Sequence, residues 1–214
     1  MTILLGLAAE DGVLLVTDSL SQEHFPNGWI KATFGRKINT LGARAAYVVS
    51  GSKPAEWAPP ADWASLPPGE IASRILAEVE LFPEPPRNGR QPGHDVLVAA
   101  YGLDGRPGLV LTGSDLALTE ARVGGSPLIG GALRDWAEAE GIRFSPAPGT
   151  LAAALPFALD CCRRYIRESW RQWGFEKLTD FHLNEPGGYC PPSAPPFCVA
   201  ILTSTELQTL EVSE

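Results

Sequence analysis

Long apolar runs are absent from this chain. The apolar stretch at residues 3–9 ends at Glu10 and Asp11, far short of the roughly 20 residues that a membrane-spanning helix requires. It also lacks the basic leader that precedes the apolar part of a secretory signal. We therefore expect a soluble, cytoplasmic protein with no membrane partner.

Positive charge is scarce as well. The chain has 17 Lys and Arg residues against 25 Asp and Glu residues, which gives a formal net charge of −8 at pH 7. Proteins that bind nucleic acids non-specifically need clustered Lys and Arg side chains to replace the counterions around phosphates. The composition therefore argues against a nucleic-acid partner.

Cysteine and histidine are few. The four cysteines form no Cys-x-x-Cys motif, and Cys161 and Cys162 are adjacent within a helical pattern, where a bond between them is awkward. The three histidines, His24, His94 and His182, have no metal-like spacing. We expect reduced thiols, no metal and no cofactor.

The chain does contain enough apolar sequence for one sizeable core. Its 214 residues are 44% hydrophobic and 20% charged, which is the composition of a globular protein. A chain of this length can bury a core without disulfide or metal staples. We therefore predict a single domain over residues 1–214.

Short β-rich segments separated by turn signals open and close the chain. Residues 2–9 and 13–19 flank Asp11-Gly12, which is a strong hairpin signal. A loop is predicted around residues 24–28. Further strands are predicted at residues 36–41, 45–50, 95–101, 109–112, 116–123, 198–203 and 207–212.

Helical periodicity covers three segments, at residues 70–82, 128–140 and 151–173. Thr150 is the predicted cap of the last, and Pro156 lies near its first turns. This order of elements lacks the strand-helix alternation of a parallel doubly wound sheet. It predicts an α+β fold with two antiparallel sheets and helices outside each.

Thr2 is the first candidate for chemistry. Small second residues generally permit removal of Met1, which would leave a free α-amino group beside the Thr2 hydroxyl. That hydroxyl needs a base to accept its proton, and a terminal amine with a pKa of about 7.7 to 8.0 suits neutral pH. If Met1 is retained, the nitrogen of Thr2 is part of a peptide bond and cannot act as the base.

Two charged residues and a glycine are spaced to assist Thr2. Asp18 ends the second strand, where a hairpin turns it toward the start of the first, although a turn-side aspartate is equally consistent. Lys37 and Asn39 share a strand face; pointing inward, Lys37 would lower the pKa of the Thr2 amine and pair with Asp18, whereas a solvated lysine is the ordinary alternative. Gly51 ends a strand and offers a backbone N–H to an oxyanion, or simply makes a turn.

These features occur in the order found in a known family. Residues 2–19, with their Asp-Gly turn, resemble the opening hairpin of proteasome β-subunits and their bacterial relatives, including the Anbu-type proteins. Arg36-Lys37-Ile38 is similar to the strand that carries the family's active-site lysine, and Ser50-Gly51 is similar to its oxyanion turn. The resemblance to N-terminal-nucleophile hydrolases covers about the first quarter of the chain well.

The resemblance implies a mechanism and a fold. Thr2 would be nucleophile and base, Asp18 and Lys37 its activating pair, and the Gly51 N–H the oxyanion donor in amide hydrolysis through an acyl-enzyme. It also implies a four-layer αββα sandwich of two antiparallel sheets.

The first functional hypothesis is a threonine-type peptidase in a homo-oligomer such as a ring. The alternatives are a small-molecule amidase or acyl transferase, or a catalytically inactive scaffold. The sequence does not tell whether an ATP-dependent partner exists.

Accessory positions of the family are less well matched. A serine is expected after the middle strands, and either Ser126 fills that place or the position falls on Gly130-Gly131, which has no hydroxyl. Leu183 and Pro186 stand where the family has an aspartate and a serine before a Gly-Gly pair, and Asp180 is out of register.

Substrate-pocket positions of the family resemble Ser21, Val49 and Lys53 in this chain. Lys53 at a pocket wall would favour acidic or polar side chains, whereas a surface lysine beside a turn is the ordinary alternative. The aromatic-rich stretch at residues 57–63 is predicted to lie exposed at an oligomer interface.

Overall fold

The computed structural model describes residues 2–25, 29–51, 57–82, 93–181, 183–184, 190–191 and 193–213. Its strands are β1 (Ile3–Ala9), β2 (Gly12–Asp18), β3 (Leu20–His24), β4 (Ile30–Phe34), β5 (Asn39–Leu41), β6 (Ala45–Ser50), β7 (Asp95–Tyr101), β8 (Pro107–Gly113), β9 (Leu116–Glu120), β10 (Leu128–Gly131), β11 (Phe197–Leu202) and β12 (Leu207–Val212). Its α-helices are α1 (Pro68–Val79), α2 (Ala132–Ala139) and α3 (Leu151–Gln172), and its short 3-10 helices are η1 (Ala61–Ser65) and η2 (Leu178–Asp180).

The strands form two five-stranded sheets and one separate hairpin. The first sheet has the order β10-β1-β2-β11-β12, the second has the order β5-β6-β7-β8-β9, and β3 pairs with β4. Neighbouring strands in all three run antiparallel. The prediction of antiparallel sheets is therefore confirmed.

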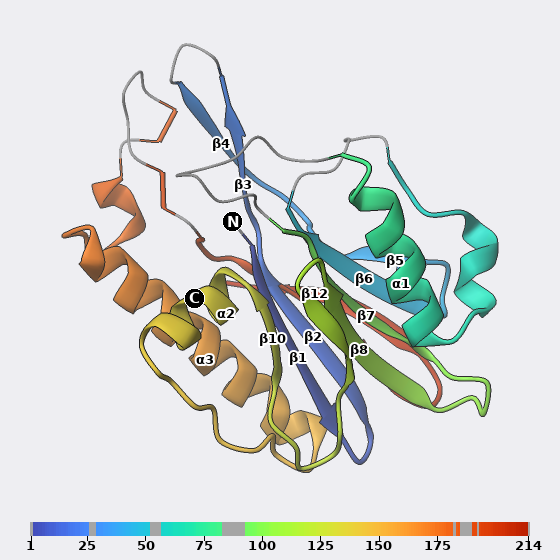
Figure 1. The fold of residues 1–214 in the computed structure, drawn as a ribbon. Helices are drawn as coiled ribbons and strands as arrows, with labels where there is room; N and C mark the ends of the chain where they lie inside the picture. Colours follow the sequence, from blue (N-terminus) through green and yellow to red (C-terminus); the bar gives the residue numbers. More distant parts are fainter. Residues whose placement is uncertain are drawn as a thin grey trace.

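Helices cover the outer faces of the two sheets, with α2 and α3 on one side and α1 on the other (Figure 1). One apolar core lies between the first sheet and α2 and α3, a second lies between the sheets, and a third lies between the second sheet and α1. Ile166, Leu15 and Ile75 are buried members of these cores, in that order. The fold is an α+β sandwich, as the order of elements predicted.

Strands β1 and β2 are buried along their whole length. They contact α3 on one face and strands of the second sheet on the other. A strand covered on both faces reads as a nearly continuous apolar run rather than an alternating one. This is why the opening of the chain is so apolar, and it places Thr2 at the edge of the buried layer.

Two predicted elements differ from the structure. Strands β3 and β4 form a hairpin, with Leu20 opposite Phe34, on either side of the predicted loop, whose residues 26–28 lie outside the described part of the chain. The helix predicted over 128–140 begins only at Ala132, because residues Leu128–Gly131 pair with β1. Gly130 and Gly131 are poor helix formers, and pairing with a buried strand satisfies their backbone groups.

Helix α3 begins where it was predicted, but its first turn is capped from another element. Thr150 occupies the cap position and makes no side-chain capping bond. The Leu151 N–H instead donates to Asp11 Oδ1 at 2.8 Å. Because Asp11 belongs to the β1–β2 turn, this bond ties the opening hairpin to α3. Pro156 lies within the second turn, and the helix continues past it.

The two tryptophans of the stretch at residues 57–63 pack against the core, so the prediction that these aromatic side chains lie exposed is wrong, although Ala58 and residues 60–62 between them are exposed. Trp63 is buried beneath α1, and Trp57 packs edge to face on Tyr47 with ring centroids 6.4 Å apart. These rings cover the outer face of the second sheet.

In the described part of the chain, the helices are either too short or too polar to cross a lipid bilayer. The four cysteines are free thiols; Cys161, Cys162 and Cys198 are buried, and Cys190 is half-buried.

Candidate active site

Thr2 is held by two hydrogen bonds to its own atoms and by a third to the next residue. Its hydroxyl oxygen accepts a hydrogen bond from Lys37 Nζ at 3.3 Å. Its carbonyl oxygen accepts the Ala132 N–H at 2.9 Å, and the N–H of the following residue, Ile3, donates to Asp18 Oδ1 at 2.9 Å. Thr2 is only 8% exposed, so the hydroxyl lies in a largely enclosed position.

Asp18 is brought to Thr2 by the register of the opening hairpin. Leu5 pairs with Val16 in that hairpin, so Asp18, two residues further along β2, comes level with Ile3. Asp18 is fully buried. The structure thus brings Asp18 to the start of β1, as the Asp-Gly turn predicted.

Lys37 lies between the Thr2 hydroxyl and the Asp18 carboxylate. Its Nζ is 3.0 Å from both carboxylate oxygens of Asp18 and 3.3 Å from Thr2 Oγ1. The side chain is 11% exposed. The ammonium group therefore donates at once to the carboxylate and to the hydroxyl, in a site with little solvent.

The backbone that presents Lys37 is not a strand, which corrects the predicted strand at residues 36–41. Strand β5 begins only at Asn39. The preceding residues are fixed by other contacts: the Gly35 N–H donates to the Ser19 carbonyl at 3.0 Å, and Ile38 is buried between the sheets. The Asn39 side-chain amide donates to the Lys37 carbonyl at 2.9 Å. Because this segment leads from the β3–β4 hairpin to the second sheet, it cannot pair along its whole length.

Neutral groups surround the Lys37–Asp18 pair. Burial raises the pKa of Cys162 and Tyr165 on α3 and of Cys198 on β11, and the negative charge of Asp18 raises each of them further. These groups therefore stay protonated and uncharged near neutral pH. As neutral groups, they do not compete with Asp18 for the positive charge of Lys37.

Gly51 directly follows β6 at the same edge of the sandwich. The side chain of the preceding residue, Ser50, lies against Gly131, and a Cβ built on Gly131 would be 2.8 Å from Ser50 Oγ and would collide with the Thr2 carbonyl. Gly51 has a φ of 110°, and a Cβ there would collide with the imidazole of His94. A side chain is excluded at Gly51 both by the backbone conformation and by this packing.

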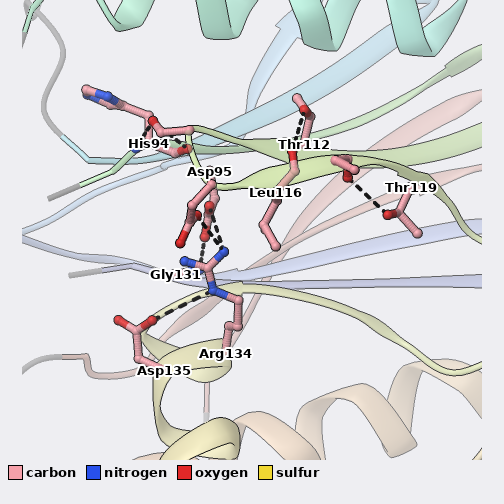
Figure 2. Close-up of polar contacts among 11 residues, drawn as sticks. His94, Asp95, Thr112, Leu116, Thr119, Gly131, Arg134 and Asp135 are labelled. Carbon is pink, nitrogen blue, oxygen red and sulfur yellow. Dashed lines mark hydrogen bonds and ion pairs between the residues drawn. The ribbon is translucent and has the colours of Figure 1, made fainter.

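The sequence did not predict Asp95, a further buried carboxylate near Thr2. Asp95, the first residue of β7, accepts the Gly131 N–H at 2.6 Å and lies 3.4 Å from Nη1 of Arg134 (Figure 2). Asp95 is 3% exposed, and burial raises its pKa although Gly131 and Arg134 both act to lower it. The only signal in the sequence is a charged residue directly before a buried apolar run.

Ser126 does not accompany Thr2, so its prediction as an accessory residue is wrong. It is exposed and precedes β10, whose first residue, Leu128, pairs with Gly6. The other end of β10, at Gly131, pairs with Ile3, roughly 10 Å further along the strand. Of the two alternatives, the Gly130-Gly131 pair lies beside Thr2, and it carries no hydroxyl.

The structure describes two of the three predicted pocket residues, Ser21 and Val49. Ser21 is exposed on β3, where it lies opposite Thr33. Val49 is buried in the core shared with α1. Lys53 lies outside the described residues.

The region after α3 has its own hydrogen bonds. Asp180 Oδ2 accepts the N–H groups of Glu176 and Lys177, both at 3.0 Å, and these bonds lower the pKa of Asp180. Its carboxylate is therefore engaged within its own loop. Leu183 packs against the core beneath α3, and Pro186 lies outside the described residues.

Over the ranges that the structure describes, no three side chains of His, Cys, Asp or Glu gather in the way that a metal ion would require. The arrangement around Thr2 brings together a hydroxyl, an ammonium group and a carboxylate.

Comparison with known proteins assigns no family. No protein-family model matches the chain, and no characterised protein matches it at a significant level.

Proposed function

We propose that this protein is an amide-bond hydrolase of the N-terminal-nucleophile class, in which Thr2 becomes the first residue and acts as the nucleophile. The observation that carries the proposal is the position of Lys37 Nζ, 3.3 Å from Thr2 Oγ1 and 3.0 Å from both oxygens of Asp18. An ammonium group that donates to the hydroxyl stabilises the negative charge that develops as the proton leaves. Asp18 holds the ammonium group in place.

The base in this proposal is the α-amine of Thr2 after Met1 has been removed. In the first stage the Oγ1 proton passes to the amine, Oγ1 bonds to the carbonyl carbon of the substrate amide, and the carbonyl electron pair moves to its oxygen. That oxyanion takes a hydrogen bond from the Gly51 N–H. When the C–N bond breaks, the leaving nitrogen takes the proton from the α-ammonium group of Thr2, and an ester on Oγ1 remains.

The second stage regenerates Thr2. The α-amine takes a proton from a water molecule as its oxygen attacks the ester carbonyl carbon. Collapse of this intermediate breaks the bond to Oγ1, which recovers the proton from the α-ammonium group, and the acid product leaves. Lys37 keeps its proton throughout and stabilises charge on Oγ1 in both stages.

A threonine-type peptidase working as a homo-oligomer, such as a ring, is part of the same proposal. Light scattering coupled to size-exclusion chromatography tests it. A species of only 22.9 kDa would contradict the assembly and would leave a small-molecule amide as the favoured substrate.

Covalent labelling tests the nucleophile. Intact mass establishes whether Thr2 is the first residue, and a β-lactone or epoxyketone probe followed by peptide mapping locates the adduct. We expect labelling at residue 2 in the wild type and in Thr2→Ser, and no labelling in Thr2→Ala. Retention of Met1, or a processed protein that neither labels nor cleaves fluorogenic peptide amides, contradicts the proposal.

A further inference from the structure

A buried carboxylate connects the two sheets next to Thr2. Asp95 belongs to the second sheet, where it pairs with Ser50 and Gly113. Its Oδ2 nevertheless accepts the N–H of Gly131, which belongs to the first sheet, at 2.6 Å. Its Oδ1 lies 3.4 Å from Nη1 of Arg134 on α2. Each oxygen thus has a separate donor on the opposite side of the sheet interface (Figure 2).

The glycines around the Asp95 carboxylate pack so closely against it that they leave little room for side chains. A Cβ at Gly113 would collide with Asp95 Oδ1, and a Cβ at Gly130 would lie 3.1 Å from Oδ2. Arg134 closes the site from α2, and it also contacts the exposed Asp115 at 3.1 Å and the exposed Asp135 at 3.7 Å. Asp95 is the buried member of this group and contacts the backbone, whereas its two acidic neighbours face solvent.

The turn that Asp95 holds is the turn that holds Thr2. Gly131 has a φ of 58° and ends β10, and its neighbour Ala132 donates its N–H to the Thr2 carbonyl at 2.9 Å. The bond from Gly131 to Asp95 fixes the orientation of this turn, so the Ala132 N–H points at Thr2. On the other side of Thr2, the Ile3 N–H is fixed by Asp18.

We propose that Asp95, oriented by Arg134, is a positioning residue that places Thr2 for attack through the Gly131–Ala132 turn. The effect of Asp95 on the reaction rate rests on the proposed function. The hydrogen bond from Ala132 to the Thr2 carbonyl does not, because it exists with or without catalysis. A nucleophile must lie within a fraction of an ångström of its productive position, and a displacement of about 1 Å can slow a reaction roughly a hundredfold.

Three variants separate this role from general stability. Asp95→Ala removes both acceptors. Asp95→Asn keeps the shape but has one oxygen for two donors, so residue 95 can no longer accept the Gly131 N–H and be oriented by Arg134 at the same time. Asp115→Asn is the matched control, because it removes an acidic partner of Arg134 that is exposed and makes no bond to Gly131.

Amide hydrogen exchange of Ala132 reports the hold on Thr2 without any requirement for activity. We expect exchange at Ala132 to accelerate roughly ten- to hundredfold in Asp95→Ala, to change by an intermediate amount in Asp95→Asn, and to stay at the wild-type rate in Asp115→Asn. Equal exchange rates in wild type and Asp95→Asn overturn the proposal, and this comparison remains available if Asp95→Ala fails to fold.

The kinetic consequence is measured with a β-lactone probe on the processed protein. For the folded Asp95 variants we expect the maximal rate of labelling at Thr2 to fall roughly tenfold or more while the concentration for half-maximal rate stays within about twofold, because the probe still binds but meets a displaced hydroxyl. Faster Ala132 exchange with an unchanged labelling rate overturns the positioning role. A wild type that does not label contradicts the proposed function instead, and the exchange experiment then decides the hold on Thr2 by itself.

Discussion

Replacement of Lys37 by methionine removes a charge that touches both Thr2 and Asp18. At 3.0 Å, two unit charges attract by roughly 5 kcal/mol in an effective dielectric of about 20. Desolvation of the pair offsets much of this attraction in the wild type. Once Lys37 is gone, Asp18 remains fully buried with the Ile3 N–H as a donor, and breaking a buried ion pair in this way costs about 3 to 5 kcal/mol. We therefore expect Lys37→Met to lower the free energy of unfolding by that amount.

The same variant should also lose activity, and the two effects can be separated. We expect β-lactone labelling of Thr2 to slow by about 10² to 10⁴-fold, the range over which a group that assists proton transfer contributes. Adding Asp18→Asn to Lys37→Met removes the uncompensated buried charge, so it should restore much of the stability and none of the labelling. The matched control is Lys31→Met, because Lys31 is an exposed lysine on β4.

Urea unfolding followed by tryptophan fluorescence measures the stability, and mass spectrometry over time measures the labelling. If Lys37→Met labels as fast as Lys31→Met, Lys37 does not activate Thr2. If the Lys37→Met and Asp18→Asn effects on the free energy of unfolding simply add, within about 0.5 kcal/mol, the pair is not coupled and the reasoning fails.

Three further outcomes follow from the same geometry. Gly51→Ala forces a methyl group against an imidazole ring at a φ of 110°, so Thr2 labelling should slow about a hundredfold, and an unchanged rate would remove Gly51 from the oxyanion site. Gly131→Ala should cost about 1 to 3 kcal/mol more in urea unfolding than Gly105→Ala, which has a φ of 75° and open space around it; equal costs would contradict the collision with Thr2. Burial raises the pKa of Tyr47 from 10.0 to about 12, so its neutral form stabilises the fold below pH 10 and that contribution is lost as pH rises toward 12. Relative to Tyr47→Phe, the wild type should lose about 1 kcal/mol between about pH 9 and pH 11, and parallel pH profiles would refute this.

The opening hairpin was predictable because it is local. An Asp-Gly turn between two apolar runs sets the register of β1 and β2, and that register alone brings Asp18 level with the start of the chain. The α+β class followed in the same way from the order of strands and helices. The position of Lys37 in the sequence was predicted, but its geometry was not. It lies before β5, in a segment that is fixed by the bond from Gly35 to Ser19 and by the burial of Ile38 between the sheets.

The choice between Ser126 and Gly130-Gly131 depended on tertiary structure. Strand β10 pairs with β1, which is more than a hundred residues earlier in the chain, and only the register of that pair decides which end of β10 lies beside Thr2. Its residues also fit a helical period, and the pairing with a buried strand overrides that preference. The buried position of Trp63 was decided in the same way, by the presence of α1 over the second sheet.

By itself, the sequence determined the class of fold and the turn that begins it, because turn chemistry and apolar periodicity act over a few residues. Thr2, Asp18 and Lys37 were singled out as a set by the resemblance to a known family. Only the tertiary structure decided which backbone groups hold Thr2. The bond from Ala132 to Thr2 continues the pairing of β10 with β1, two strands far apart in the chain, and the bond from Gly131 to Asp95 joins the two sheets. No local sequence pattern encodes contacts that form only when distant segments pack together.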